Sequence, residues 1–231
     1  MASKTKLVLF ISILSAFSFA WKSDTGNDDK TISFRTFKNA DIGVRTKPGS
    51  ATLINDELEI VAGGADIWGK HDEFHFSYLK LKGDFDISVQ IKNLSAANKY
   101  TKAGLMARTS LSDSSQHVFF QVFPDNSPRN KNNGGCEFQY RSEIAAEMKA
   151  IYPDLKTAGN QFDVTFPNTW VRLKREGDVF ESFFSNDAKN WKLYTSFTIN
   201  MPRELFVGLA VTAHNSDDFT KSRFAVIRLK K

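Results

Sequence analysis

The chain has 231 residues, of which 41% are hydrophobic, with 31 Lys and Arg against 26 Asp and Glu. This length and apolar content suit one domain with a large core. The basic residues are interleaved with acidic ones, which excludes nucleic acid as the main partner, since that would require a concentrated basic face. A mildly basic surface would suit an acidic polysaccharide.

The first 20 residues have the pattern of a cleavable signal peptide. Lys4 and Lys6 precede an apolar run from Leu7 to Phe17, and Ser18-Phe19-Ala20 supplies small residues for cleavage after Ala20. The apolar run is shorter than the roughly 20 residues that span a bilayer, so we expect no membrane span. We expect residues 1–20 to be removed and the protein to be secreted or periplasmic.

The remaining chain divides into a short leader and one domain. Residues 21–33 are polar and rich in turn-forming residues, so we interpret them as a leader or linker, and residues 34–231 as the domain. Cys136 is the only cysteine and cannot form an internal disulfide. Burial of apolar side chains, among them many of the 21 Phe, must therefore supply the stability of the domain.

Short segments with alternating apolar and polar residues recur along the domain and predict β-strands. Turn residues separate them, and Gly177 is the strongest hairpin candidate because it can take a positive φ. Many short strands with little helix predict a β-sandwich or jelly roll. The predicted strands are 57–63, 74–81, 85–91, 103–108, 117–123, 136–141, 170–176, 179–185, 205–214 and 222–229.

Two segments between strands are longer than simple turns. Residues 124–135 form a polar turn region, and residues 142–168 are too long for a hairpin connection. The start of the second segment predicts one short helix with Ser142 as its N-cap. Long loops of a sandwich often carry function, although a disordered insertion explains the length equally well.

Alternation along the strands separates an apolar side from a side with planar polar groups. In the segment 117–123, Val118, Phe120 and Val122 share one side, and Gln121 lies on the other with His117. If the neighbouring strands are adjacent, the second side forms a shallow groove that contains Arg108, Gln121, Gln139 and Arg141. Such groups can bind sugar hydroxyls. The alternative is an ordinary solvent-facing sheet.

The stretch "DIWGKHDEFHF" concentrates acidic and aromatic residues, and three interpretations of it remain open. Trp68 could stack on a sugar while Glu73 and His75 bind hydroxyls. Asp66 and Asp72 could instead bind a structural Ca²⁺. The stretch could also be a turn with Trp68 in the core. Zinc is disfavoured, because His71 and His75 would lie about 13 Å apart along a strand.

The search for catalytic groups assigns no catalytic residue. A glycoside hydrolase needs two well-placed carboxylates. The pair that comes nearest to this requirement is Glu57 and Glu59, and its pattern is more typical of a solvent-facing edge strand. A polysaccharide lyase needs a cation or amide and a proton-abstracting Tyr or His. The residues of the right types are Arg108, His117, Gln121, Gln139, Tyr140, Arg141 and His214, although the alternation places Tyr140 toward the core.

Five stretches occur in an order that is similar to a known family. They are "GGADIWGKHDEFHF", "KAGLMAR", "EFQYR", "WVRLKREGDVFESFFSNDAKNW" and "FVGLAVTAHN". Together they resemble the concanavalin-A-like jelly-roll modules of the "regulation of enolase" type, over residues 34–231. The resemblance implies an all-β, single-domain jelly-roll β-sandwich and an extracellular module associated with carbohydrate.

We therefore predict a secreted, lectin-like protein that binds a carbohydrate or polysaccharide on a polar concave sheet face, with no nucleic acid partner. No cofactor is expected, with structural calcium at Asp66 and Asp72 as the alternative. A glycoside hydrolase or polysaccharide lyase acting on the same face, and a protein-interaction sandwich without a glycan ligand, remain as alternatives. The predicted ligand-binding residues are Trp68, Glu73, His75, Arg108, Gln121, Gln139, Arg141 and His214.

Overall fold

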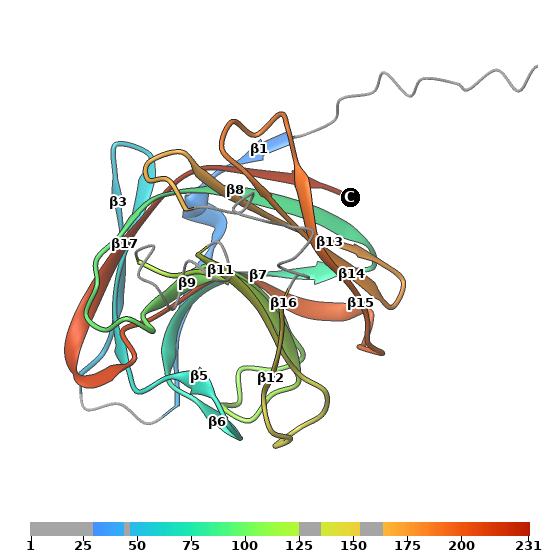
Figure 1. The fold of residues 1–231 in the computed structure, drawn as a ribbon, viewed down its shortest axis with the longest axis horizontal. Coiled ribbons are helices and arrows are strands. Elements are labelled where there is room, and N and C mark those ends of the chain that lie inside the picture. The colour runs from blue at the N-terminus through green and yellow to red at the C-terminus, as the bar shows by residue number, and fades with distance from the viewer. Residues whose placement is uncertain (1–29, 44–46, 125–134, 153–163) are drawn as a thin grey trace, which may run out of the picture.

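The computed structural model describes residues 30–43, 47–124, 135–152 and 164–231. Two antiparallel β-sheets pack face to face in a sandwich (Figure 1). The predicted signal peptide lies outside the described residues, as do parts of the segments 124–135 and 142–168. In the part of the chain that is described, no helix is long and apolar enough to cross a membrane.

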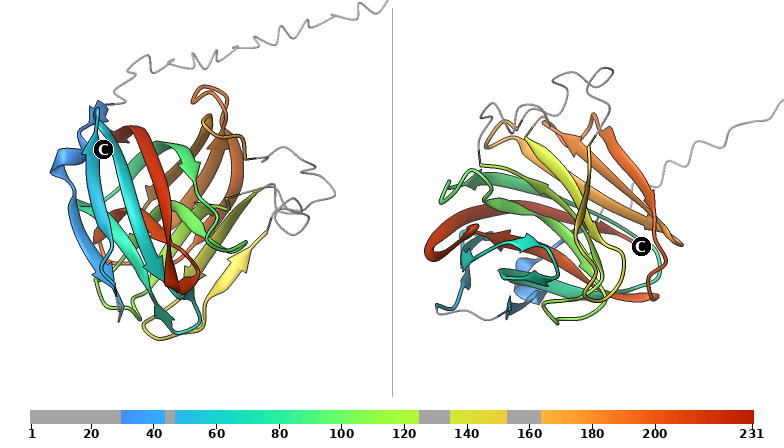
Figure 2. Two further views of the ribbon diagram at one scale, coloured as in Figure 1. Left: turned by 90° about the vertical axis from the view of Figure 1, so that its left-hand side faces the viewer. Right: turned by 60° about the horizontal axis from the view of Figure 1, so that its bottom comes forward.

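Sheet A has the strand order β15-β14-β13-β8-β17-β4-β3, and β1 also pairs with β17. Two views show β17 running beside β4 in this sheet (Figure 2). Its strands are β1 (Lys30–Ile32), β3 (Ser50–Ile54), β4 (Glu57–Gly64), β8 (Phe85–Leu94), β13 (Thr169–Glu176), β14 (Val179–Ser185), β15 (Lys192–Thr198) and β17 (Asn215–Lys230).

Sheet B has the strand order β12-β11-β10-β9-β16-β7-β2. Its strands are β2 (Lys38–Ile42), β7 (Phe74–Lys82), β9 (Lys102–Arg108), β10 (His117–Val122), β11 (Cys136–Arg141), β12 (Lys149–Ile151) and β16 (Glu204–Thr212). A separate ribbon of β5 (Ile67–Trp68) and β6 (His71–Asp72) lies on the side of sheet B away from sheet A (Figure 1). A single 3₁₀ turn, η1 (Phe34–Thr36), follows β1.

The predicted all-β sandwich is confirmed, and each predicted strand is present with small changes at its ends, except that β17 begins seven residues before the predicted start at 222. The missed strands are mostly short edge segments, such as β1, which lies inside the predicted leader and pairs with the end of β17. The hairpin at Gly177 is also confirmed, since this residue has a φ of 58° between β13 and β14.

The core between the sheets consists of the apolar sides that alternation predicted. Val118, Phe120 and Val122 of β10 are fully buried in it, and Tyr140 packs against it, as expected. Cys136, which forms no disulfide, is buried at the start of β11. A second apolar cluster, which includes Phe74, lies outside this core and contains residues of the opposite side of sheet B.

The predicted helix after Ser142 is wrong. Residues 142–148 form turns and irregular backbone, and Ala145 has a φ of 58°, which an α-helix does not allow. The backbone N–H groups of this segment bind other loops: Ala145 N donates to Ser114 O at 2.9 Å and Met148 N donates to Gly69 O at 3.1 Å. The segment is therefore attached to the β5–β6 ribbon.

Candidate functional site

The outer face of sheet B, which points away from sheet A, gathers polar side chains from adjacent strands. The adjacency assumed from the sequence is confirmed, because β11, β10 and β9 are consecutive neighbours. Across these strands His117 lies directly opposite both Arg141 and Arg108, and Gln121 lies opposite Glu137. The predicted shallow groove is wrong in one respect, because all of these side chains are buried.

Asp72 is the centre of a buried ionic network on this face. Its two carboxylate oxygens accept hydrogen bonds from the Arg141 guanidinium at 2.7 and 2.8 Å, and Arg108 Nη2 lies 3.5 Å away. All three side chains are completely buried. The network joins the β5–β6 ribbon, which carries Asp72, to the face of sheet B.

Arg108 and Arg141 hold loops, so the prediction that they contact ligand does not fit their geometry. The donors of Arg141 that do not bind Asp72 bind backbone carbonyls, including Ala146 O at 3.0 Å and Gly69 O at 2.9 Å. Arg108 Nε donates to Ser110 O at 2.7 Å, and its guanidinium lies over the Phe74 ring. These donors are already used, so a uronate carboxylate would have to break protein contacts to reach them.

His117 is a neutral hydrogen-bond acceptor within this network. Burial, together with the charges of Arg108 and Arg141, lowers the pKa of His117 to about 4, although Asp72 opposes the shift. Nδ1 lies 3.0 Å from Ser115 O, and a carbonyl only accepts, so Nδ1 carries the proton. Nε2 is therefore an acceptor, and it is buried without a partner among the described residues.

Three further side chains beside this network have unsatisfied polar atoms. Gln139 Nε2 donates to Glu137 Oε1, which leaves Gln139 Oε1 and Glu137 Oε2 without partners in the described part of the chain. Both amide atoms of Gln121 also lack partners there. We call Gln121, Glu137, Gln139 and His117 the orphan cluster; at most 2% of any of these residues is exposed.

The neighbours of Gln121 explain why its amide finds no protein partner. Across the sheet it lies between Glu137 and Gly104, and the next residue beyond Gly104 is Ala210. Alternation places Phe119 beside it on the same face. Of these neighbours, only Glu137 has a side-chain acceptor; Gln139 binds its Oε1, and its Oε2 makes no hydrogen bond to Gln121.

The orphan cluster contains more acceptors than donors. Its unpaired acceptors are Gln121 Oε1, Glu137 Oε2, Gln139 Oε1 and His117 Nε2, whereas Gln121 Nε2 is its only unpaired donor. Each buried polar group without a partner costs about 1–3 kcal/mol of stability. A group that satisfied this cluster would have to bring several hydrogen-bond donors.

Two predicted ligand residues lie away from this face. His75 is on the inner side of β7, opposite Val211, because its neighbours Phe74 and Phe76 point outward. His75 Nδ1 lies 2.9 Å from Asp41 Oδ1. Glu73 Oε2 accepts a hydrogen bond from Ala65 N at 3.0 Å, so its carboxylate stabilises the turn before the β5–β6 ribbon.

Asp66 and Trp68 both contact Lys102, and Asp66 also contacts His214. Asp66 lies 2.6 Å from Lys102 Nζ and 3.0 Å from His214 Nδ1, and Lys102 Nζ lies over the Trp68 ring. Burial alone would raise the pKa of Asp66, but the hydrogen bonds and charges of His214 and Lys102 lower it. Trp68 is 42% exposed, which excludes the predicted alternative of a core tryptophan.

The structure does not favour calcium at Asp66 and Asp72. Each carboxylate is bound by its own cationic side chain, Lys102 for Asp66 and Arg141 for Asp72. Among the described residues, no group of three or more His, Cys, Asp or Glu side chains is placed to hold a metal ion. His71, a rejected zinc ligand, lies beside Asp113 at 3.1 Å.

Comparison with solved structures gives the fold. A functionally unknown protein from Saccharomyces cerevisiae matches with a TM-score of 0.62 and 14% identity, over 86% of this chain and 98% of the yeast chain. Lectin I-B4 from Griffonia simplicifolia matches with a TM-score of 0.50 and 9% identity, over 91% of this chain and 95% of the lectin. These matches confirm the predicted concanavalin-A-like sandwich.

A third structure shares the fold only over part of its length. The GH43 BlXynB protein from Bacillus licheniformis matches with a TM-score of 0.55 and 10% identity, over 78% of this chain but 34% of that protein. No curated protein gives a significant match. The model of one protein family matches residues 45–231, so the chain belongs to the DUF1349 family of proteins of unknown function.

Proposed function

We propose that the protein binds a carbohydrate on the outer face of sheet B, with the orphan cluster as the centre of the site. The observation that carries this proposal is the set of buried acceptors that have no donor among the described residues. A sugar presents several hydroxyl groups, each of which can donate and accept a hydrogen bond. It therefore matches four acceptors and one amide donor better than an anion, which only accepts.

The surroundings of the cluster suit a small sugar. Phe119, between Gln121 and His117 on β10, supplies an apolar ring on which the C–H face of a sugar can pack. From His117 to Gln121 the cluster extends about 13 Å along the strand. Since its side chains are enclosed, the site suits a small saccharide or a chain end better than the middle of a long polymer.

An enzyme that acts on this face is less well supported. Arg108 and Arg141, which would neutralise a uronate in a lyase, are bound to Asp72 and to backbone carbonyls. Glu57 and Glu59, the closest carboxylate pair in the sequence, are paired with Lys92 and Arg223 on sheet A. The remaining carboxylate of the face, Glu137, has no second acid placed with it by the described contacts.

The test is a glycan-array screen of the protein followed by calorimetric titration of any sugar that binds. The variants Gln121→Met and Glu137→Gln should weaken binding at least about tenfold, because each removes hydrogen bonds in an enclosed site. Gln90→Met is the matched control, since Gln90, on β8 of sheet A, donates to Pro167 O in the turn before β13. Equal binding by wild type and Gln121→Met would overturn the proposal, as would no binding to any glycan.

We also propose that this chain is of the "regulation of enolase" type and is secreted after cleavage behind Ala20. The five ordered motifs and the N-terminal apolar run support these two proposals. Mass spectrometry of the mature protein from its native host tests the second one. A first residue at Trp21 is expected, and a retained residue 1 would contradict secretion by this route.

A further inference from the structure

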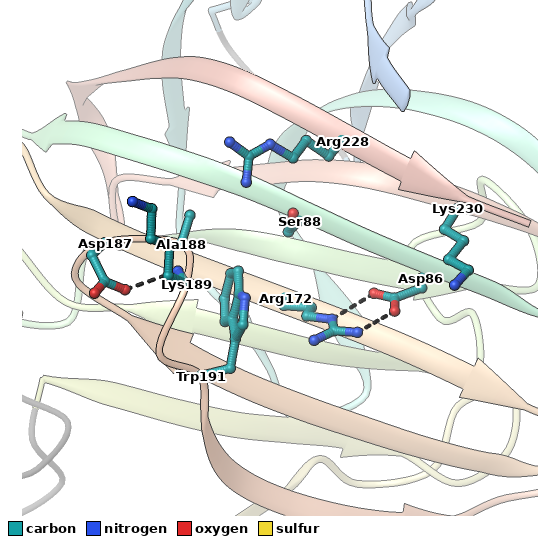
Figure 3. Close-up of a pocket in the computed structure, with 9 residues that line it drawn as sticks. All are labelled: Asp86, Ser88, Arg172, Asp187, Ala188, Lys189, Trp191, Arg228 and Lys230. Atoms are coloured by element: carbon teal, nitrogen blue, oxygen red, sulfur yellow. Dashed lines mark hydrogen bonds and ion pairs between the residues drawn. The ribbon is translucent and has the colours of Figure 1, made fainter. Parts of the chain in front are cut away.

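A pocket lies on the outer face of sheet A, on the opposite side of the sandwich from the orphan cluster. It has a volume of about 670 Å³ and is open to solvent on one side. Its floor consists of Asp86 and Ser88 of β8, Arg172 of β13, and Arg228 and Lys230 of β17 (Figure 3). The loop after β14 forms its wall with Asp187, Ala188, Lys189 and Trp191.

The strand register of sheet A places Arg172 and Arg228 on either side of Ser88. Arg172 and Arg228 are the direct cross-strand partners of Ser88, one on each side (Figure 3). The two Cα atoms are therefore about 10 Å apart, which is two strand spacings. The Ser88 hydroxyl makes no hydrogen bond to another residue that the structure describes, so it is available in the centre of this row.

The cations of the pocket outnumber its carboxylates, and they are not all neutralised. Arg172 is bound bidentately by Asp86 and lies over the rings of Phe183 and Trp191. Arg228 lies over the Trp170 ring and, within the described ranges, has no carboxylate partner. Lys230 and Lys189 also have no carboxylate partner among the described residues. Three positive charges therefore face the pocket without a counter-ion from the described part of the chain.

The wall is held in place by its own hydrogen bonds. The Asp187 carboxylate accepts from Lys189 N and Asn190 N at 2.8 Å each, and from Ser185 Oγ at 3.0 Å. The bonds from Asn190 and Lys189 to this carboxylate lower the pKa of Asp187 far below its usual value. The loop therefore presents Trp191 at a fixed position before β15.

We propose that this pocket binds an acidic saccharide, with the carboxylate of a uronic acid residue over Ser88 between Arg228 and Lys230. Arginine and lysine bind carboxylates through charge-assisted hydrogen bonds. Asp86 and Asp187 disfavour a dense polyanion, yet their oxygens can accept hydroxyl groups of a sugar. The indole of Trp191 supplies an apolar wall for a sugar ring. This mixture of charges fits a ligand that combines one anionic group per ring with several hydroxyls.

This inference is independent of the proposed function, because the two sites lie on different sheets. The probe is tri-galacturonic acid, with neutral galactotriose for comparison, titrated calorimetrically at low and high NaCl. We expect the acidic probe to bind more tightly than the neutral one and to weaken as salt rises. Arg228→Gln and Lys230→Gln should each weaken it about tenfold.

A control variant separates this pocket from the rest of sheet A. Lys221→Gln removes the same charge from β17 outside the pocket and should bind like wild type. Unchanged affinity in both Arg228→Gln and Lys230→Gln would overturn the proposal. Inorganic sulfate that displaces the probe at equal concentration would also overturn it, because the pocket would then recognise any small anion.

Discussion

Replacing Gln121 with methionine tests whether its unpaired amide destabilises the unliganded protein and contributes to ligand binding. Methionine has nearly the shape of glutamine but no amide, so the change removes two buried atoms that lack partners. A buried amide without partners costs about 1–3 kcal/mol in the unliganded protein. We therefore expect the free energy of unfolding of the unliganded protein to rise by about 1–3 kcal/mol, while sugar binding weakens at least about tenfold.

Urea denaturation and thermal unfolding measure this difference. For a domain of this size, each kcal/mol corresponds to a rise in Tm of about 2–4 °C. Gln90→Met, which removes an amide hydrogen-bonded to Pro167, should instead lose about 0.5–1.5 kcal/mol. If Gln121→Met were destabilised as much as Gln90→Met, the amide would already be satisfied in the ligand-free protein, and the argument for a binding site would fail.

Other predictions concern the ionic network and two glycines. Asp72→Asn should lower the free energy of unfolding by about 3–5 kcal/mol in urea titrations, because it leaves two buried arginines without their charge partner. His117 has a folded-state pKa of about 4, below its usual 6.5, so the unfolded state binds the proton first and stability should fall as pH drops from about 6.5 to 4. His117→Asn should remove roughly 3 kcal/mol of this loss, and an unchanged pH profile would refute the assignment. Gly177→Ala should cost about 1 kcal/mol, since only its positive φ resists a side chain, whereas Gly104→Ala should prevent folding because its Cβ would lie 2.1 Å from a backbone oxygen. Circular dichroism and unfolding curves of the two variants check this contrast.

Alternation of side chains was enough to predict the sandwich and its two sides. The long central strands carry the strongest pattern, so their two faces were predicted correctly. The adjacency of β9, β10 and β11 was assumed, and the structure confirms it. Short edge strands such as β12 carry too few residues for a pattern. The predicted helix after Ser142 failed because tertiary hydrogen bonds to Ser114 and Gly69 outweighed local helix propensity.

The site was only partly predictable. Side-chain alternation placed Gln121 and Gln139 on one face. No pattern in the sequence shows whether other segments of the chain cover that face. Whether the face is covered depends on tertiary contacts, because most of the Arg141 donors bind residues 26 to 72 positions away in the chain. Glu137 was not among the predicted ligand-binding residues. Its place opposite Gln121 on adjacent strands was the signal that could have added it to the site.

The order of strands in the two sheets also constrains when the protein can fold. The last two strands of the chain, β16 and β17, occupy interior positions: β16 separates β9 from β7, and β17 separates β8 from β4. Neither sheet can close until residues 204–230 are available, so a chain still held by the ribosome must keep its earlier apolar strands unpaired across these gaps. The two sheets can therefore close only after residues 204–230 have left the ribosome.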